Sequence, residues 1–189
     1  MPHALARLAL AAAAALAAAC SSATDPTPAT PTLVAAEAGT LATGLFAQAS
    51  VASPSQGKPS ADGAYAVASQ CPAGGTVSTT IAVAGVTANP DGSTSYRATA
   101  TVTPQQCVLG TGARQIAITG DPSYVIAAAF TASHAGVVTG TSTVTGGFKW
   151  DGGSCQLNYT AVTSASGTGR TVTVTGTVCG QSVNRIATF

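Results

Sequence analysis

The sequence predicts a mainly β fold, an antiparallel up-and-down meander of about eight strands that forms either a barrel or a curled sheet. Hydrophobic and polar residues alternate from residue 64 onward, most regularly between Tyr96 and Thr103. Glycine, proline and aspartate interrupt this alternation at regular intervals. Charged residues make up only 7% of the chain, while Val, Thr and Ala are abundant. Together these features favour one β domain over residues 64–189.

Alternation and turn residues place the individual strands. The predicted strands are 64–70, 76–86, 94–103, 113–119, 124–132, 137–145, 155–163 and 171–179. The fifth of them is apolar on both faces between Tyr124 and Phe130. We therefore expect that strand to lie in the middle of the sheet.

One helix is predicted ahead of the strands and packed on the sheet. Five apolar residues repeat at helical spacing: Val34, Ala38, Leu41, Leu45 and Ala49. Thr30 suits the cap position and Pro31 suits the first turn. Gly39 and Gly44 oppose the helix by about 1 kcal/mol each relative to alanine. Residues 33–63 are therefore expected to contain a helix and a linker.

The turns of the β domain follow a rhythm. Four aspartates recur about 30 residues apart, each followed by Gly or Pro: Asp62, Asp91, Asp121 and Asp151. In an up-and-down meander every second turn lies at the same end, so these aspartates are expected at one end of the sheet. Gathered carboxylates can bind Ca²⁺, but turn formation explains the same residues, and no metal site is predicted.

Four of the five cysteines lie in the β domain: Cys71, Cys107, Cys155 and Cys179. On the meander, the first two lie at the end away from the aspartate turns and the last two lie at the aspartate end. Four cysteines can pair in three ways. Only bridges 71–107 and 155–179 keep each disulfide at one end of the sheet.

Pairing Cys155 directly across from Cys179 has a consequence for strand register. It sets the apolar face that carries Leu157 and Tyr159 against the threonine face around Thr173. Either a bulge shifts the register, or both faces of these strands are partly covered.

The β domain offers little catalytic chemistry. On the meander its one histidine, His134, lies away from the aspartates, so a Ser-His-Asp arrangement with Ser133 lacks its carboxylate. Catalysis by paired carboxylates needs two acids in one cleft, whereas these acids occupy separate turns. The chain has no basic patch for nucleic acid and no phosphate-binding loop, and no cofactor is expected. An enzyme is therefore not predicted.

Two aromatic residues between glycines are a candidate ligand-binding site. Phe148 and Trp150 would share one face of an extended strand. The flanking glycines would leave that face open to a ligand. Alternatively, Trp150 fills a gap in the core or at a sheet edge.

The N-terminus has the features of a bacterial export signal. Arg7 precedes a run of Leu and Ala over residues 8–19, which is shorter than the ~20 residues of a membrane-spanning helix. The stretch Leu16-Ala17-Ala18-Ala19-Cys20 resembles the lipobox of bacterial lipoproteins, although Ala17 stands where that family usually has leucine. The resemblance implies that residues 1–19 are removed and that Cys20 is lipidated. The alternative is an ordinary secretory signal, but lipidation of Cys20 leaves an even set of cysteines for disulfides.

The segment after the lipobox is predicted to be a tether. Residues 20–32 are rich in Pro, Ser and Thr, which favours extended, polyproline-like conformations. By analogy with envelope lipoproteins, Ser21 favours the outer membrane. The protein is thus expected to be exported and anchored by its lipid to the outer membrane or cell surface.

Parts of the β domain also resemble known envelope proteins. The stretches 155–160 and 174–183 are similar to uncharacterised Thr/Gly-rich β-strand bacterial lipoproteins. The favoured function is a non-catalytic structural or interaction module with a protein or small-molecule partner. One alternative is a carrier of a lipid or glycan, because eight strands can close around a ligand. Another is an inhibitor of an extracellular hydrolase, because residues 164–167 are similar to a stretch of lipoproteins that inhibit lysozyme.

Overall fold

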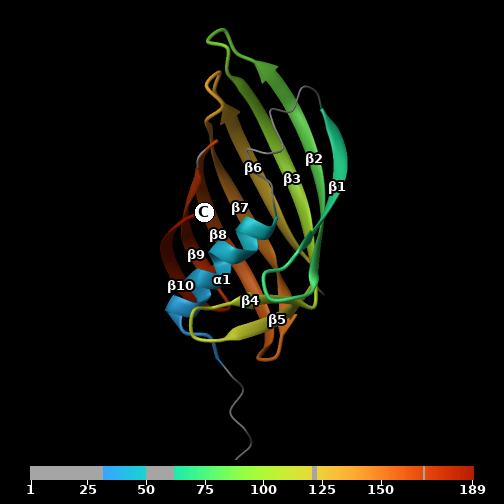
Figure 1. The fold of residues 1–189 in the computed structure, drawn as a ribbon, viewed down its shortest axis with the longest axis vertical. Coiled ribbons are helices and arrows are strands. Elements are labelled where there is room, and N and C mark those ends of the chain that lie inside the picture. The colour runs from blue at the N-terminus through green and yellow to red at the C-terminus, as the bar shows by residue number, and fades with distance from the viewer. Residues whose placement is uncertain (1–31, 50–61, 121–122, 168) are drawn as a thin grey trace, which may run out of the picture. The chain divides into compact units, whose positions relative to one another are not determined.

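The computed structural model describes residues 32–49, 62–120, 123–167 and 169–189. The predicted signal segment, Cys20 and nearly all of the predicted tether lie outside these residues. Within them the chain forms a mainly β fold with one helix ahead of the strands (Figure 1). The elements are α1 (Ala35–Gln48), β1 (Gly63–Gln70), β2 (Thr76–Ala88), β3 (Thr94–Gln105), β4 (Cys107–Gly110), β5 (Gln115–Thr119), β6 (Tyr124–Ala132), β7 (Val138–Trp150), β8 (Gly153–Ser166), β9 (Gly169–Val178) and β10 (Gln181–Thr188).

The strands form one antiparallel sheet that is curled but not closed. Its long strands follow one another in the order β1-β2-β3-β6-β7-β8-β9-β10, so β1 and β10 are the two edges. β6 lies in the middle, as predicted for the strand that begins at Tyr124. The predicted meander is confirmed, in its open, curled form.

A short hairpin, β4 with β5, interrupts the meander after β3. The predicted strand 113–119 contributes only β5, which pairs with β4 and with the last residues of β7. β3 pairs directly with β6. Because the hairpin adds no full-length strand, every later turn lies at the end opposite to the predicted one.

The prediction that the aspartate turns gather at one end is therefore wrong. Asp62 and Asp91 lie at the same end, where the Asp62 carboxylate accepts a hydrogen bond from Val86 N at 3.0 Å. Asp151 follows β7 at the opposite end. Asp121 lies outside the described residues.

Both predicted disulfides are present. Cys71 pairs with Cys107 and Cys155 pairs with Cys179, with Cα atoms 5.5 Å and 4.4 Å apart. The two bridges lie at the same end of the sheet and not at opposite ends, because the β4–β5 hairpin reverses the later turns. Structural disulfides are typical of an oxidising compartment outside the cytosol.

The register at the second bridge is settled by the β9–β10 turn. Cys179 belongs to this turn, with a φ of 50°, and Gly180 follows with a φ of 77°. Two successive positive φ values are those of a type I′ hairpin turn. Leu157 therefore pairs with Val178, one residue away from the predicted register, and the pairing runs on without a bulge. The apolar residues of β8 and β9 thus share one face.

α1 lies across the inside of the curled sheet (Figure 1). It contacts β9, β10 and β4. Its fully buried side carries Ala38, Leu41, Ala42, Leu45 and Phe46. The predicted apolar stripe is correct except for Val34, which is 58% exposed because it precedes the first helical residue. Full burial of a Leu or Phe side chain contributes about 1.5–3 kcal/mol, which outweighs the cost of the two helix glycines.

Two buried tyrosines tie α1 to the sheet. Tyr124 Oη donates to the carbonyl oxygen of Leu45 at 3.1 Å, and Tyr159 Oη donates to that of Ala42 at 3.1 Å. Burial raises the pKa of both phenols, so both remain neutral donors. We call the face of the sheet that carries these tyrosines the inner face, and the opposite one the outer face.

Candidate binding groove on the outer face of the sheet

The outer face carries a groove of about 720 Å³. It crosses the ends of β2, β3, β6 and β7 that lie nearest the Asp91 turn. This volume falls within the range of small-molecule and cofactor binding sites, about 300–1,000 Å³.

Two rows of side chains line the groove. Pairing across the four strands aligns the first row: Thr87, Ser95, Thr131 and Thr139. The second row lies beside it: Arg97, Ala129 and Thr141. Because directly paired residues point to the same face of a sheet, both rows point away from α1.

The floor of the groove is made by small residues. Ala129 lies at the centre of the second row. Gly140 lies behind the floor, where a Cβ atom would be 2.2 Å from Phe130 Cδ1. Glycine is therefore required there for the ring of Phe130 to pack under the groove.

A β-bulge shapes the wall of the groove on β2. The pairing of β2 with β3 shifts between Ala84 and Thr87, which inserts one extra residue into β2. Gly85 has a φ of 64°, a conformation that glycine adopts without steric cost. Such a bulge increases the local twist of the strand and so redirects Thr87 relative to the residues before it.

The β2–β3 turn holds the Ser95 hydroxyl group of the first row in place. Asn89 Nδ2 donates to Ser93 Oγ at 2.8 Å and to Ser95 Oγ at 2.9 Å. Ser95 Oγ lies 3.4 Å from Thr131 Oγ1, which continues the chain of polar groups onto β6. The side chain of Ser95 is therefore fixed before any ligand arrives.

The same turn engages the carboxylate of Asp91. Asp91 Oδ1 accepts a hydrogen bond from Ser93 N at 2.9 Å. Hydrogen bonds from the Ser93 side chain and backbone hold the pKa of Asp91 below its ordinary value. This confirms the turn that the sequence predicts at residues 89–92 and leaves the Asp91 carboxylate committed to it.

Arg97 carries the charge of the groove. Among the described residues that line it, no other side chain is charged. Arg97 is exposed, and its guanidinium forms no ion pair or hydrogen bond within the part of the chain that the structure describes. By contrast, Arg114 pairs with Glu37, and the guanidinium of Arg170 lies over the ring of Phe189. The groove therefore presents an uncompensated positive charge among hydroxyl groups.

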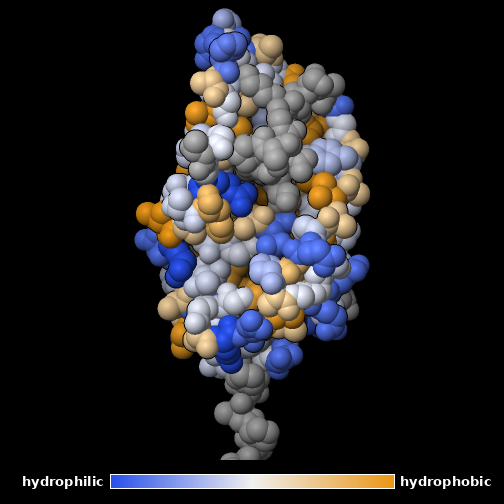
Figure 2. Space-filling model, in the orientation of Figure 1, coloured by the Kyte–Doolittle hydropathy of each residue, from blue (hydrophilic) through white to orange (hydrophobic). Residues whose placement is uncertain are grey.

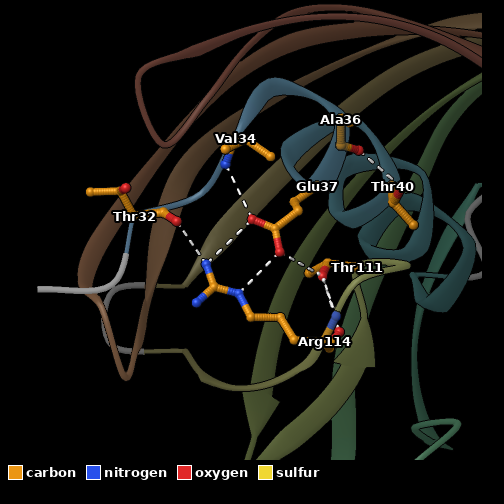
Figure 3. A network of polar contacts seen from close by, with 7 residues as sticks. All are labelled: Thr32, Val34, Ala36, Glu37, Thr40, Thr111 and Arg114. Atoms are coloured by element: carbon orange, nitrogen blue, oxygen red, sulfur yellow. Dashed lines mark hydrogen bonds and ion pairs between the residues drawn. The ribbon is translucent and has the colours of Figure 1, made fainter.

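A second polar cluster joins the first turn of α1 to the β4–β5 loop (Figure 3). Glu37 Oε1 accepts hydrogen bonds from Arg114 Nε at 3.0 Å and from Thr111 Oγ1 at 3.1 Å. Glu37 Oε2 accepts from Val34 N at 3.2 Å, which satisfies a backbone donor at the helix start. Arg114 Nη2 also donates to the carbonyl oxygen of Thr32 at 2.7 Å.

This cluster is structural. The hydrogen bond from Val34 N, with further help from Thr111 and Arg114, lowers the pKa of Glu37 despite the opposing effect of burial. These hydrogen bonds engage both carboxylate oxygens of Glu37, so the cluster fixes the start of α1 against the hairpin.

The aromatic pair predicted from the sequence does not form an exposed platform. Phe148 is completely buried in the core, with an exposed fraction of 0%. Trp150 is half-buried against the core, and Arg114 Cζ lies 5.4 Å from the centre of its ring. Trp150 thus fills the gap beside the hairpin, which is the alternative that the sequence left open.

His134 lies at the end of the sheet opposite to the predicted one. It follows β6 in the turn next to Gly92, where a Cβ atom would be 3.7 Å from His134 Nδ1. Asp91, which precedes Gly92, is therefore close to His134 in space, but its carboxylate accepts a hydrogen bond from Ser93 N. Ser133 Oγ accepts a hydrogen bond from Val137 N at 3.1 Å. These contacts are those of two tight turns.

Sequence reasoning did not single out Arg97 as a candidate binding residue. Its outward neighbours on β3 are all Ser or Thr: Ser95, Thr99, Thr101 and Thr103. The one guanidinium in that row was a usable signal, but the alternating pattern does not show which strands lie beside it. Only the β3–β6 pairing brings Arg97 next to Ala129 and Thr141.

Comparisons of the chain with protein-family models, with curated proteins and with solved structures gave no match. Within the described ranges, no group of three or more His, Cys, Asp or Glu side chains is placed to hold a metal ion. The described helix is too short and insufficiently apolar to cross a membrane.

Proposed function

We propose that this protein is an exported, non-catalytic binding module of the cell envelope, anchored through a lipid on Cys20. Its binding surface is the outer-face groove. The observation that carries the proposal is the place of α1. The side chains of Leu41, Leu45 and Phe46 are buried against the inner face, so the interior of the curled sheet is occupied by the protein itself. A ligand is therefore expected on the outer face.

Two further observations support this proposal. The two disulfides are suited to an oxidising compartment. On the side of the molecule that carries α1, hydrophilic and hydrophobic residues are interspersed (Figure 2). A lipid carrier is instead expected to present a broad apolar opening on that side.

The anchor is tested by a fractionation experiment in the native host. We expect the wild-type protein to sediment with membranes and its Cys20→Ser variant to be released in soluble form. The denatured mass of the wild-type protein should show loss of residues 1–19 and addition of lipid. An unmodified Cys20 in the membrane fraction would refute the proposed anchor.

A carrier function is the second candidate, and one observation favours it. Ser142 Oγ and Thr163 Oγ1 are buried on the inner face without a hydrogen-bonding partner. Buried hydroxyls normally have a partner, so a bound molecule at this position would satisfy them. Mass spectrometry of the protein from its own membranes separates the two functions. Extra mass under native conditions that denaturation removes supports the carrier, and equal masses support the surface module.

A further inference from the structure

We propose that the outer-face groove binds an acidic polysaccharide and that Arg97 pairs with its carboxylate or phosphate groups. This inference rests on the proposed function and names the class of its ligand.

The first argument is charge. Arg97 has no anionic partner among the described residues, and the described lining contains no carboxylate. A guanidinium presents a planar set of donors that matches the two oxygens of a carboxylate or phosphate. An anionic ligand therefore supplies the partner that the protein does not.

The second argument is the chemistry of the other lining groups. Thr131, Thr139 and Thr141 each present a hydroxyl, which can donate one hydrogen bond and accept others. Sugar hydroxyls have the same dual character. A ligand that carries both hydroxyls and negative charge therefore satisfies both kinds of group in the groove.

The third argument is length. The first row of the groove crosses four strands, from Thr87 on β2 to Thr139 on β7. With about 4.8 Å between neighbouring strands, this row is about 14 Å long. A single small anion would contact Arg97 alone, whereas a chain of sugars can reach both rows.

The fourth argument concerns the aromatic rings beneath the groove. Tyr96 and Phe130 are 8% and 2% exposed, and their ring centres are 5.6 Å apart on the inner side of the sheet. They offer a ligand on the outer face no ring to stack on. A neutral polysaccharide would therefore have to bind through hydroxyl contacts alone, which compete with water. The charge of the ligand is what gives this groove selectivity.

The test is a calorimetric titration of the purified mature protein with three polymers. Polygalacturonate carries carboxylates, poly(glycerol phosphate) carries phosphates, and dextran is neutral. We expect at least one acidic polymer to bind, with dextran showing no measurable heat. The polymer that binds distinguishes a carboxylate ligand from a phosphate ligand.

Variants of the groove test the geometry. Arg97→Ala is expected to weaken the binding of the acidic polymer about tenfold or more, and Arg97→Lys should restore part of it. Ala129→Glu, which places a carboxylate at the centre of the groove, should weaken it at least as much. The matched control is Thr145→Glu, which adds the same charge to the outer face of β7. It lies about 13 Å along the strand from Thr141, beyond the screening length of about 8 Å in physiological salt.

Each outcome is decisive. Equal affinities for wild-type and Arg97→Ala proteins, equal effects of Ala129→Glu and Thr145→Glu, or equal binding of dextran would each overturn the inference. Failure of both acidic polymers to bind the wild-type protein would also overturn it. None of these results bears on the lipid anchor, which fractionation tests. Nor do they bear on whether the inside of the sheet holds a bound molecule, which native mass spectrometry tests.

Discussion

Tyr159 donates its phenolic hydrogen to the carbonyl oxygen of Ala42 at 3.1 Å, across 117 positions of sequence. The bond joins the middle of β8 to a helix that precedes every strand of the sheet. Tyr124 makes the equivalent bond to Leu45 one helical turn later. The helix is therefore positioned by directed polar contacts as well as by its apolar side.

Removing one of these hydroxyls should destabilise the fold measurably. For Tyr159→Phe we expect a loss of about 1 kcal/mol in the free energy of unfolding, the usual contribution of one buried hydrogen bond. Chemical denaturation of the two proteins measures this difference. Tyr65→Phe is the control, because Tyr65 is 40% exposed and donates no hydrogen bond to a described residue. Equal stabilities of Tyr159→Phe and wild type would contradict the proposed positioning of α1.

The polar cluster at the start of α1 predicts a dependence on pH. Because the folded state lowers the pKa of Glu37, its contribution to stability is complete above the unfolded pKa of about 4.3. That contribution is lost as the pH falls through the lower, folded pKa. We expect the stability difference between wild type and Glu37→Gln to be largest near neutral pH and to shrink in acid. Thermal unfolding from pH 7 to pH 3 checks this, and a difference that grows in acid would refute it.

Gly140 is predicted to tolerate no side chain. In Gly140→Ala the new methyl group would meet Phe130 Cδ1 at 2.2 Å and the carbonyl oxygen of Ala129 at 2.3 Å. Overpacking of this kind costs about 1–3 kcal/mol. In Gly110→Ala, the matched strand control, the methyl group meets nothing within 4 Å. Urea denaturation should show a clear loss for Gly140→Ala alone, and similar curves for the two variants would show that the strands can separate at this point.

The disulfide pairing can be checked directly. Peptide mapping without reduction should join Cys71 to Cys107 and Cys155 to Cys179. Replacing Cys71 and Cys107 together by alanine should cost about 3–4 kcal/mol, because the bridge closes a loop with a sequence separation of 36. A peptide that joins Cys107 to Cys155 would be incompatible with the sheet described above.

Much of the fold follows from local sequence pattern. The alternation over 94–103 identifies β3, and the stripe from Ala38 to Ala49 identifies the buried side of α1. Such patterns predict elements because burial of one face is a local property of the chain. The predicted cysteine pairing is correct although its premise is not: the prediction put the two bridges at opposite ends of the sheet, whereas all four cysteines lie at one end.

The rest depended on information that a local pattern does not contain. β4 has only four residues, and β10 buries Val183 but places Asn184 and Arg185 in exposed positions, so neither gives a clear alternation. Because β4 was not predicted, the β4–β5 hairpin was interpreted as one full strand. His134 and Asp151 were therefore predicted at the wrong ends of the sheet. The groove was beyond prediction for a related reason, because it exists only where four strands are aligned in register.

The position of α1 also constrains how the chain acquires its structure. The helix is the earliest described element, yet its packing partners include β9 and β10, the two last strands. Contacts between such distant parts of a chain form slowly, since the intervening segment must first be ordered. Until those strands arrive, the apolar side of α1 that carries Leu41, Leu45 and Phe46 is only partly covered. The cover of the apolar side of α1 is thus completed only when β9 and β10 have formed, and a chain that lacks β10 would leave part of that side open to proteolysis.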